Sequence, residues 1–410
     1  MSGASDSAES GPESRTGIGQ IFWVFLRLGL TSFGGPVAHL GYFRDELVGR
    51  RKWLSDQNYG DLVALCQLLP GPTSSQTGIG IGLAKGGIPG AFAAWTGFTL
   101  PSALLMTLFG LGLSGIGGGL DAGLLRGLMI VAAAVVARAI WGMGISLCPD
   151  LPRVTIAILA AALALAVPTS TGQIAVILAG AVAGVAFVRG VTSQDEATLG
   201  ISVGHGLAVT ALALFVILFF GLPLLYQAFP SQALALADSF YRSGSFVFGG
   251  GHVVLPLLQA EVVPNGWVDN ETFLAGYGAA QAVPGPLFTF AAFLGAVSQL
   301  EPNGWLGALI CLIAIFAPSF LLVIGALPYW DRLRGFPAMR RALAGVNAAV
   351  VGLLIAVFYD PIWTSAIQSR EDFVLGIAAF GLLAFWKVPA WLVVALAAGV
   401  GTSLSFVGML

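Results

Sequence analysis

The sequence predicts an all-α polytopic integral membrane protein built from two homologous halves of inverted topology, with helices broken at Gly-Gly and Pro-Gly-Pro. Of its 410 residues, 57% are hydrophobic and only 9% are charged, whereas soluble domains carry about 25% charged residues. Apolar runs of membrane-spanning length recur along the chain, and one stretch of about fifty residues occurs twice. No soluble domain is evident, which argues against an enzyme that acts on large soluble substrates.

The repeated stretch covers residues 25–77 and 240–290, and its matched residues keep one register apart from a single deletion. The pairs are Arg27 with Arg242, Phe33-Gly34-Gly35 with Phe248-Gly249-Gly250, Glu46 with Glu261, Gln67 with Gln281, and Pro70-Gly71-Pro72 with Pro284-Gly285-Pro286. Further on, Pro101-Ser102 recurs as Pro318-Ser319. Chance does not align so many unusual residues, so the chain contains an internal duplication.

Hydropathy divides the chain into thirteen apolar segments, arranged as six, one linker and six. The segments are 18–43, 59–84, 88–115, 122–147, 153–168, 172–189, 206–226, 238–260, 272–300, 304–328, 340–360, 372–386 and 388–408. We expect a disordered polar tail over 1–17, a first repeat over 18–200, a linker helix over 201–233 and a second repeat over 234–410. Seven segments separate the two repeat starts, and an odd number predicts that the halves are inverted.

The charges in equivalent loops support the inversion. Residues 44–52 contain three arginines and a lysine, whereas the counterpart 261–271 contains three acidic residues and no basic one. Under the positive-inside rule, the first loop is cytoplasmic and the second is not.

The basic residues 331–341 predict the number of crossings, because they too should be cytoplasmic. Residues 331–341 lie on the cytoplasmic side only if each repeated stretch forms two re-entrant hairpins, one bent at Gly-Gly and one at Pro-Gly-Pro. Irregular backbone at membrane depth must line protein or a cavity. We therefore expect about nine crossings and four re-entrant hairpins, with thirteen crossings as the alternative.

Several classes of chemistry have no support in the sequence. There is no GxxxxGK[ST] motif for ATP, and the three histidines and three cysteines lack metal-ligand spacing. We expect Cys66, Cys148 and Cys311 to be buried thiols. The sequence predicts no cofactor, no metal, no nucleic-acid partner and no enzymatic activity.

The first Pro-Gly-Pro predicts an anion site. Pro70-Gly71-Pro72 ends one helix, because each proline removes a backbone donor and Pro72 restricts Gly71. Thr73 and Ser74 would cap a new helix whose N-terminus attracts anions. The second copy, Pro284-Gly285-Pro286, has only Thr289 nearby as a weaker cap. The alternative for either copy is a proline kink that serves only packing.

Arg27 and Arg242 are the charged residues expected to meet such an anion. An arginine within apolar sequence costs at least about 2.5–3.5 kcal/mol on insertion scales, so it normally faces a cavity or a partner. Its planar fork also suits a tetrahedral dianion. The alternatives are snorkelling to the membrane surface, or pairing with Glu46 and Glu261.

Four further groups are candidates for coupling transport to a gradient. Glu46 and Glu261 could carry protons if partial burial raises their pKa, or they could be salt-bridge partners. His39 and His252, which are not equivalent in the repeat, could titrate near neutral pH or serve as structural hydrogen-bonding groups.

The motifs Ser32-Phe33-Gly34-Gly35-Pro36, Gln67 to Pro72, Phe248-Gly249-Gly250-Gly251-His252 and Gln281 to Pro286 resemble the chromate transporter family, in its long two-domain bacterial form. The resemblance extends from about residue 18 to 408. It implies efflux of chromate across the bacterial inner membrane, giving chromate resistance and driven by a proton or charge gradient. Sulfate is the natural competitor or counter-substrate. The second copy departs from the pattern, with Gly251 in place of Pro36 and Leu287-Phe288 in place of Thr73-Ser74.

We predict a secondary active transporter that holds the dianion where the two halves meet near the bilayer midplane and alternates access by rocking. The predicted substrate-binding residues are Arg27, Ser32, Gly34, Gly35, Gln67, Pro70, Gly71, Pro72, Thr73, Ser74, Arg242, Gly249, Gly250, Gln281, Pro284, Gly285 and Pro286. A sulfate or other oxyanion carrier and a passive anion channel are the alternatives. The sequence leaves the coupling ion and a homodimer open.

Overall fold

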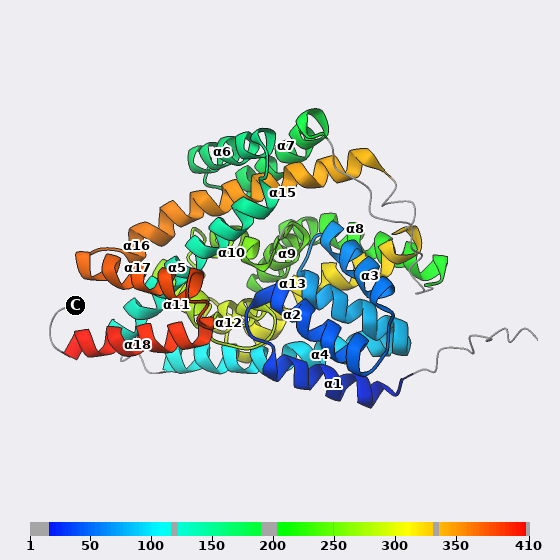
Figure 1. The fold of residues 1–410 in the computed structure, drawn as a ribbon, viewed down its shortest axis with the longest axis horizontal. Coiled ribbons are helices and arrows are strands. Elements are labelled where there is room, and N and C mark those ends of the chain that lie inside the picture. The colour runs from blue at the N-terminus through cyan, green and yellow to red at the C-terminus, as the bar shows by residue number, and fades with distance from the viewer. Residues whose placement is uncertain (1–15, 116–121, 190–202, 249, 331–335, 407–410) are drawn as a thin grey trace, which may run out of the picture.

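The computed structural model describes residues 16–115, 122–189, 203–248, 250–330 and 336–406. The predicted disordered tail, apart from its last two residues, lies outside this range, as do Gly249 and residues 331–335 of the basic loop. The described residues form helices joined by short loops, as expected of an all-α protein (Figure 1).

The described residues of the first half and the linker form eight α-helices and one π-helix. They are α1 (Ile18–Thr31), α2 (Gly35–Phe43), η1 (Arg44–Arg50), α3 (Asp56–Leu68), α4 (Thr73–Gly115), α5 (Ala122–Leu147), α6 (Leu151–Ala166), α7 (Ser170–Phe187) and α8 (His205–Ala228).

The second half begins at α9. Its elements are α9 (Gln232–Ser245), η2 (Gly251–Val253), α10 (Val254–Val262), α11 (Asn270–Ala280), η3 (Leu287–Thr289), α12 (Phe290–Ala296), α13 (Gly304–Ala326), η4 (Leu327–Tyr329), α15 (Pro337–Val357), η5 (Phe358–Trp363), α16 (Thr364–Ala366), α17 (Arg370–Ala384) and α18 (Ala390–Phe406).

Among the described residues, five helices are long and apolar enough to cross a membrane, judged by length and composition. They are Thr73–Leu113, Gly123–Leu147, His205–Ala228, Gly304–Tyr329 and Pro337–Ala366. The chain is therefore a multi-pass membrane protein.

The two apolar segments that contain the Gly-Gly motifs are each divided into shorter helices. Segment 18–43 becomes α1 and α2, and 238–260 becomes α9 and α10. At 1.5 Å per residue, the 14 residues of α1 reach about 21 Å, less than the roughly 30 Å hydrocarbon core. Neither piece of these segments is long enough to cross the membrane as a straight helix.

The helix that follows each Pro-Gly-Pro turns back against the next helix. In α4 the turn lies at Gly87, whose φ of 62° and ψ of −155° are not helical, and Gly82 meets the Gly90 carbonyl so closely that a Cβ would not fit. The second half places Gly295 against Gly307 in the same way, between α12 and α13. Small residues allow such close backbone contact.

The two halves exchange their last helices. The first half's α6 and α7 pack along α15 of the second half, whereas α17 and α18 of the second half pack along α5 of the first (Figure 1). Matched glycines make both contacts possible: Gly345 meets Gly180 and Gly184, and Gly127 lies against Gly401. This exchange holds the halves together as one body.

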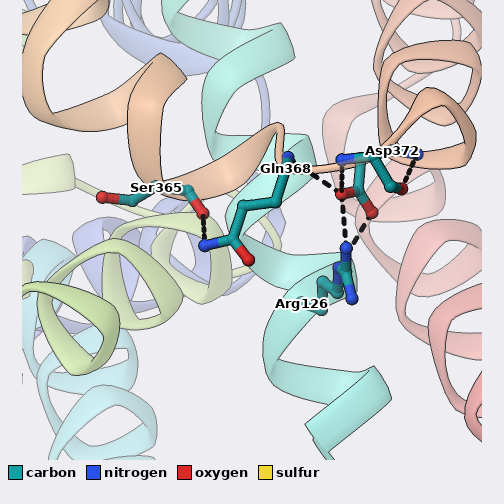
Figure 2. Close-up of polar contacts among 5 residues, drawn as sticks. Arg126, Ser365, Gln368 and Asp372 are labelled. Atoms are coloured by element: carbon teal, nitrogen blue, oxygen red, sulfur yellow. Dashed lines mark hydrogen bonds and ion pairs between the residues drawn. The ribbon is translucent and has the colours of Figure 1, made fainter.

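One ion pair reinforces the contact between α5 and α17. Arg126 donates two hydrogen bonds to Asp372, with N–O distances of 2.9 and 2.6 Å (Figure 2). The Asp372 side chain is fully buried, and it also accepts the N–H groups of Gln368 and Ser369. These bonds fix the start of α17 against the first half.

Candidate functional site

The chain leaves helical geometry at the glycines that the sequence singles out. Gly34 and Gly35 have φ values of 101° and 82°, and Gly250 has 148°. Gly71 and Gly285, at the centres of the two Pro-Gly-Pro motifs, have φ values of 132° and 100°. Residues with a side chain rarely adopt such angles, which explains why glycine occupies these positions.

The breaks of the two halves are joined by crossed hydrogen bonds. The Gly71 N–H donates to the Val247 carbonyl at 2.7 Å, and the Gly285 N–H donates to the Ser32 carbonyl at 2.9 Å. Ser32 and Val247 occupy equivalent positions of the repeat, as do the two glycines. Each Pro-Gly-Pro is therefore bonded to the turn after the first helix of the other half, so the four breaks gather where the halves meet.

The first half offers a helix N-terminus at this meeting point. Helix α4 begins at Thr73, and its first i→i−4 bond runs from the Gln76 N–H to the Pro72 carbonyl at 2.9 Å. The N–H groups of Thr73, Ser74 and Ser75 therefore have no carbonyl one turn earlier within the helix. Such amides and the helix dipole favour an anion.

The hydroxyls here do not act as the caps that the sequence predicts. Because the helix begins at Thr73, the cap position falls on Pro72, which has no side-chain acceptor. The Ser74 hydroxyl instead lies 3.3 Å from Nδ1 of His39, and the Gln76 amide donates to the Pro70 carbonyl at 2.7 Å. The Gln76 side chain, and not a hydroxyl, therefore bonds to the Pro-Gly-Pro turn that precedes α4.

Several buried polar atoms around the breaks have no hydrogen-bond partner among the described residues. They are Ser32 Oγ, His39 Nε2, Ser75 Oγ, Gln76 Oε1, Thr99 Oγ1 and Ser319 Oγ. All six residues are at most 2% exposed. Buried polar groups normally find partners, so this concentration distinguishes the site from the rest of the core.

Gln76, Thr99 and Ser319 were not predicted from the sequence as members of this cluster. For Ser319, the recurrence of Pro-Ser in both halves was a usable signal. Gln76 and Thr99 lie on apolar helices without a repeated partner, since the positions matching them are Phe290 and Phe316.

The Pro-Gly-Pro of the second half is not followed by a long helix or by hydroxyl groups at the positions matching Thr73 and Ser74. Pro286 is followed by η3, a single 3-10 turn, and the Thr289 hydroxyl donates to the Pro286 carbonyl at 2.9 Å instead of accepting an N–H. Phe288 replaces Ser74. The amide of Gln281 is buried without an acceptor among the described residues, whereas Gln67, its counterpart, is exposed.

Arg27 lies apart from the residues of the breaks. Its exposed side chain lines an open pocket of about 180 Å³ with Thr31, Tyr42, Asp45, Glu46 and Arg50 among its neighbours. In the same region, Glu46 accepts hydrogen bonds from Arg50 at 3.4 Å and from Arg51 at 2.8 Å. The geometry of Glu46 matches the salt-bridge alternative.

Arg242 is partly buried and paired. It forms an ion pair of 2.7 Å with Asp238, one helical turn earlier in α9, and not with the Glu261 considered from the sequence. Glu261 accepts a hydrogen bond from the Ser239 hydroxyl at 2.7 Å. Asp238 has no counterpart in the first half, where Trp23 holds the matching position.

The two histidines have different partners, as their unmatched positions suggest. His39 lies between Ser74 and the ring of Phe98, with centroids 5.4 Å apart. His252 lies 2.6 Å from the Tyr277 hydroxyl through Nδ1. Within the described residues, no three His, Cys, Asp or Glu side chains gather as metal ligands would.

Comparison with known proteins places this geometry in context. A family model described as "Chromate transporter" matches residues 19–185 and again 234–402. The chain is 31% identical over 404 residues to the "Chromate transport protein" of Pseudomonas aeruginosa, covering 94% of this chain and 92% of that one. It is 29% identical to the "Probable chromate transport protein" of Synechococcus elongatus, covering 93% and 94% of the two chains. No solved structure matches.

Proposed function

The chain belongs to the chromate transporter family, and on this premise we propose that it exports chromate across the bacterial inner membrane by secondary active transport. In this proposal a proton or charge gradient drives the export, which gives the cell chromate resistance. Sulfate, a dianion of the same shape, competes for the site.

The observation that carries the proposal is the pair of crossed hydrogen bonds beside the N-terminus of α4. They bring the breaks of both halves to one place, where three backbone amides precede the first intrahelical bond and several buried hydroxyls have no partner among the described residues. An oxyanion supplies four acceptor oxygens and two negative charges, which the amides and the helix dipole stabilise.

We propose that the two halves are inverted, and that the short helices on either side of each break form re-entrant hairpins. Irregular backbone at membrane depth is tolerated where it lines a site, and inverted repeats commonly bind substrate where they meet. Rocking of one half against the other then exposes the dianion to each side in turn.

The arginines have a longer-range role in this mechanism. Arg27, in its open pocket, raises the positive potential at one entrance and attracts the dianion. Arg242 supplies the same charge at the opposite entrance whenever its pairing with Asp238 opens. Neither needs to contact the oxyanion at the breaks.

Glu261 is the coupling candidate that the contacts favour over Glu46. Its carboxylate accepts a hydrogen bond from a neutral hydroxyl, that of Ser239, whereas Glu46 is bonded to two arginines. Two ion pairs hold Glu46 in the salt-bridge role, so Glu261 is the carboxyl group left for coupling.

The test is uptake of chromate and of sulfate into everted membrane vesicles with and without a proton gradient. We expect saturable, gradient-dependent chromate uptake, inhibited by sulfate, that an uncoupler abolishes. Glu261→Gln should reduce the dependence on the gradient, and the matched Glu46→Gln should leave it unchanged. Flux that ignores the uncoupler would indicate a passive channel, and uptake of sulfate alone would indicate a different oxyanion carrier.

A further inference from the structure

The repeated Pro-Ser pairs have no role in the mechanism so far. Ser102 follows Pro101 in α4, and Ser319 follows Pro318 in α13. Both serines are buried, at 1% and 0% exposure. A hydroxyl at the same place in both halves calls for an explanation other than packing.

Each serine lies against the Pro-Gly-Pro of the other half. A Cβ added to Gly71 would lie 2.6 Å from the Ser319 hydroxyl, and one added to Gly285 would lie 2.8 Å from the Ser102 hydroxyl. The N–H groups of both glycines already donate to carbonyls. The serine hydroxyls are therefore among the donors closest to the breaks that could still serve a ligand.

The two serines differ in what they bind. The Ser102 hydroxyl donates to the Thr99 carbonyl at 3.0 Å within its own helix. The Ser319 hydroxyl has no partner among the described residues, although it is fully buried. A buried hydroxyl without a partner is unfavourable until an acceptor arrives, so Ser319 is the serine that is ready to donate.

The break that Ser319 faces is also the one with more hydrogen-bond donors. Gly71 is followed after Pro72 by the free amides at the start of α4 and by the unpartnered Ser75 hydroxyl. Ser102 faces the other break, where the following residues are Leu287 and Phe288 and the helix is a single turn. The donors of both halves thus converge at one break and not at the other.

We propose that Ser319 is a substrate-binding residue, whose hydroxyl donates to the oxyanion held at the N-terminus of α4. The inference rests on the proposed function and refines it: the chain has one oxyanion site, shared between the halves, in which the contacting donors are uncharged hydroxyls and amides. The ligand class is a tetrahedral oxyanion with at least two acceptor oxygens free. Because α13 and α4 belong to different halves, relative movement of the halves would remove Ser319 from the ligand and weaken binding.

The experiment measures equilibrium binding of radiolabelled chromate, and in parallel sulfate, to the full chain purified in lipid nanodiscs. A hydrogen bond to a charged group accounts for about a tenfold change in affinity or more, so Ser319→Ala should raise the dissociation constant of both oxyanions about tenfold or more. The matched Ser102→Ala should change the dissociation constant less than about twofold, because in the unsubstituted chain the Ser102 hydroxyl already donates within its own helix and not to the ligand. Ser319→Thr keeps the hydroxyl and should restore most of the affinity.

Thermal unfolding of the same samples separates binding from folding. Ser319→Ala removes an unpartnered hydroxyl, so the ligand-free protein should melt no earlier than the unsubstituted chain. Equal effects of the two alanine variants on binding, unchanged binding in Ser319→Ala, or a lowered melting temperature together with weakened binding would each overturn the role of Ser319. If the unsubstituted chain binds neither oxyanion, the proposed function fails and this inference with it; binding without transport would leave the site standing and refute only the transport mechanism.

Discussion

The segments between the two breaks of each half have related sequences but different surroundings. The first inter-break segment (residues 35–68) lies at the periphery, where α2 and α3 make their main contacts with α4 and η1. The second inter-break segment (residues 251–280) is packed inside the molecule, against α5, α7, α9, α12 and α15. Four of the thirteen residues of α3 are buried, compared with seven of the eleven residues of α11.

The arginines of the two copies show the same contrast. Arg27 is exposed in an open pocket, whereas Arg242 is closed against Asp238. Near the first segment, Arg44 forms an exposed ion pair with Asp56 and thereby lowers the pKa of that carboxyl group. The first copy of the motif therefore leaves its arginine exposed, whereas the second copy holds its arginine in an ion pair. In the proposed mechanism, alternating access requires the two copies to differ in their surroundings at any one time.

The largest expected effect is at the centre that both halves share. Gly71→Val would combine a positive φ with a clash against Ser319 and Gln76, which together cost about 2–6 kcal/mol of stability. We expect most of the protein to be lost from the monodisperse fraction in size-exclusion chromatography, and Gly285→Val to behave similarly.

Gly35→Ala is the control for this prediction. Gly35 also has a positive φ, but nothing lies within 4 Å of its added Cβ, so its cost should be about 1–2 kcal/mol. If Gly71→Val were no more harmful than Gly35→Ala, the close contact between the halves at Gly71 would be contradicted.

The next effect concerns the ion pair between α5 and α17, at one of the exchanged contacts. Arg126→Ala leaves the buried Asp372 carboxylate without its cation, which costs about 3 kcal/mol for a buried pair. The melting temperature should fall clearly. In the double variant Arg126→Ala/Asp372→Ala, the loss of stability should be smaller than the sum of the losses in the two single variants. Additive effects in this cycle would show that the two side chains do not interact.

A smaller effect should distinguish the two arginines of the repeat. Arg242→Ala removes the partner of a nearly buried aspartate, so we expect a loss of stability of about 1–3 kcal/mol. Arg27→Ala removes an exposed side chain, and its effect should stay within about 0.5 kcal/mol. Thermal unfolding of both variants measures these losses of stability. Equal losses would mean that Arg27 and Arg242 have equivalent surroundings.

The mildest test changes no interaction and reports only exposure. Tyr42 and Leu257 are equivalent in the repeat, yet they are 42% and 4% exposed. In a chain whose own cysteines are replaced, Tyr42→Cys should react rapidly with a water-soluble maleimide and Leu257→Cys slowly. Similar reaction rates would remove the contrast between an open and a closed half.

The sequence predicted the architecture better than the contacts of the site. The duplication, the two breaks in each half and the membrane-protein class follow from patterns that reflect the backbone alone, such as Pro-Gly-Pro and glycine at positive φ. The partners of Arg242 and Ser74 depend on neighbours that have no counterpart in the other half, such as Asp238 and His39. Comparing the copies therefore could not reveal them.

The exchange of the last helices was also beyond the sequence. Glycines at matching positions predict close helix contacts, but Gly345 could have met a glycine of its own half as readily as Gly180. The choice between these packings depends on the whole surface of each helix, which hydropathy does not describe.

The central claim, that two inverted copies of one broken-helix unit meet in the bilayer, is tested most directly by the sidedness of Arg50 and Asp269. Each residue is replaced singly by cysteine in the chain without its own cysteines, and an impermeant maleimide is applied to intact cells and to everted vesicles. We predict that Arg50→Cys is labelled only in everted vesicles and Asp269→Cys only in intact cells. Labelling of both from the same side would contradict the inverted arrangement.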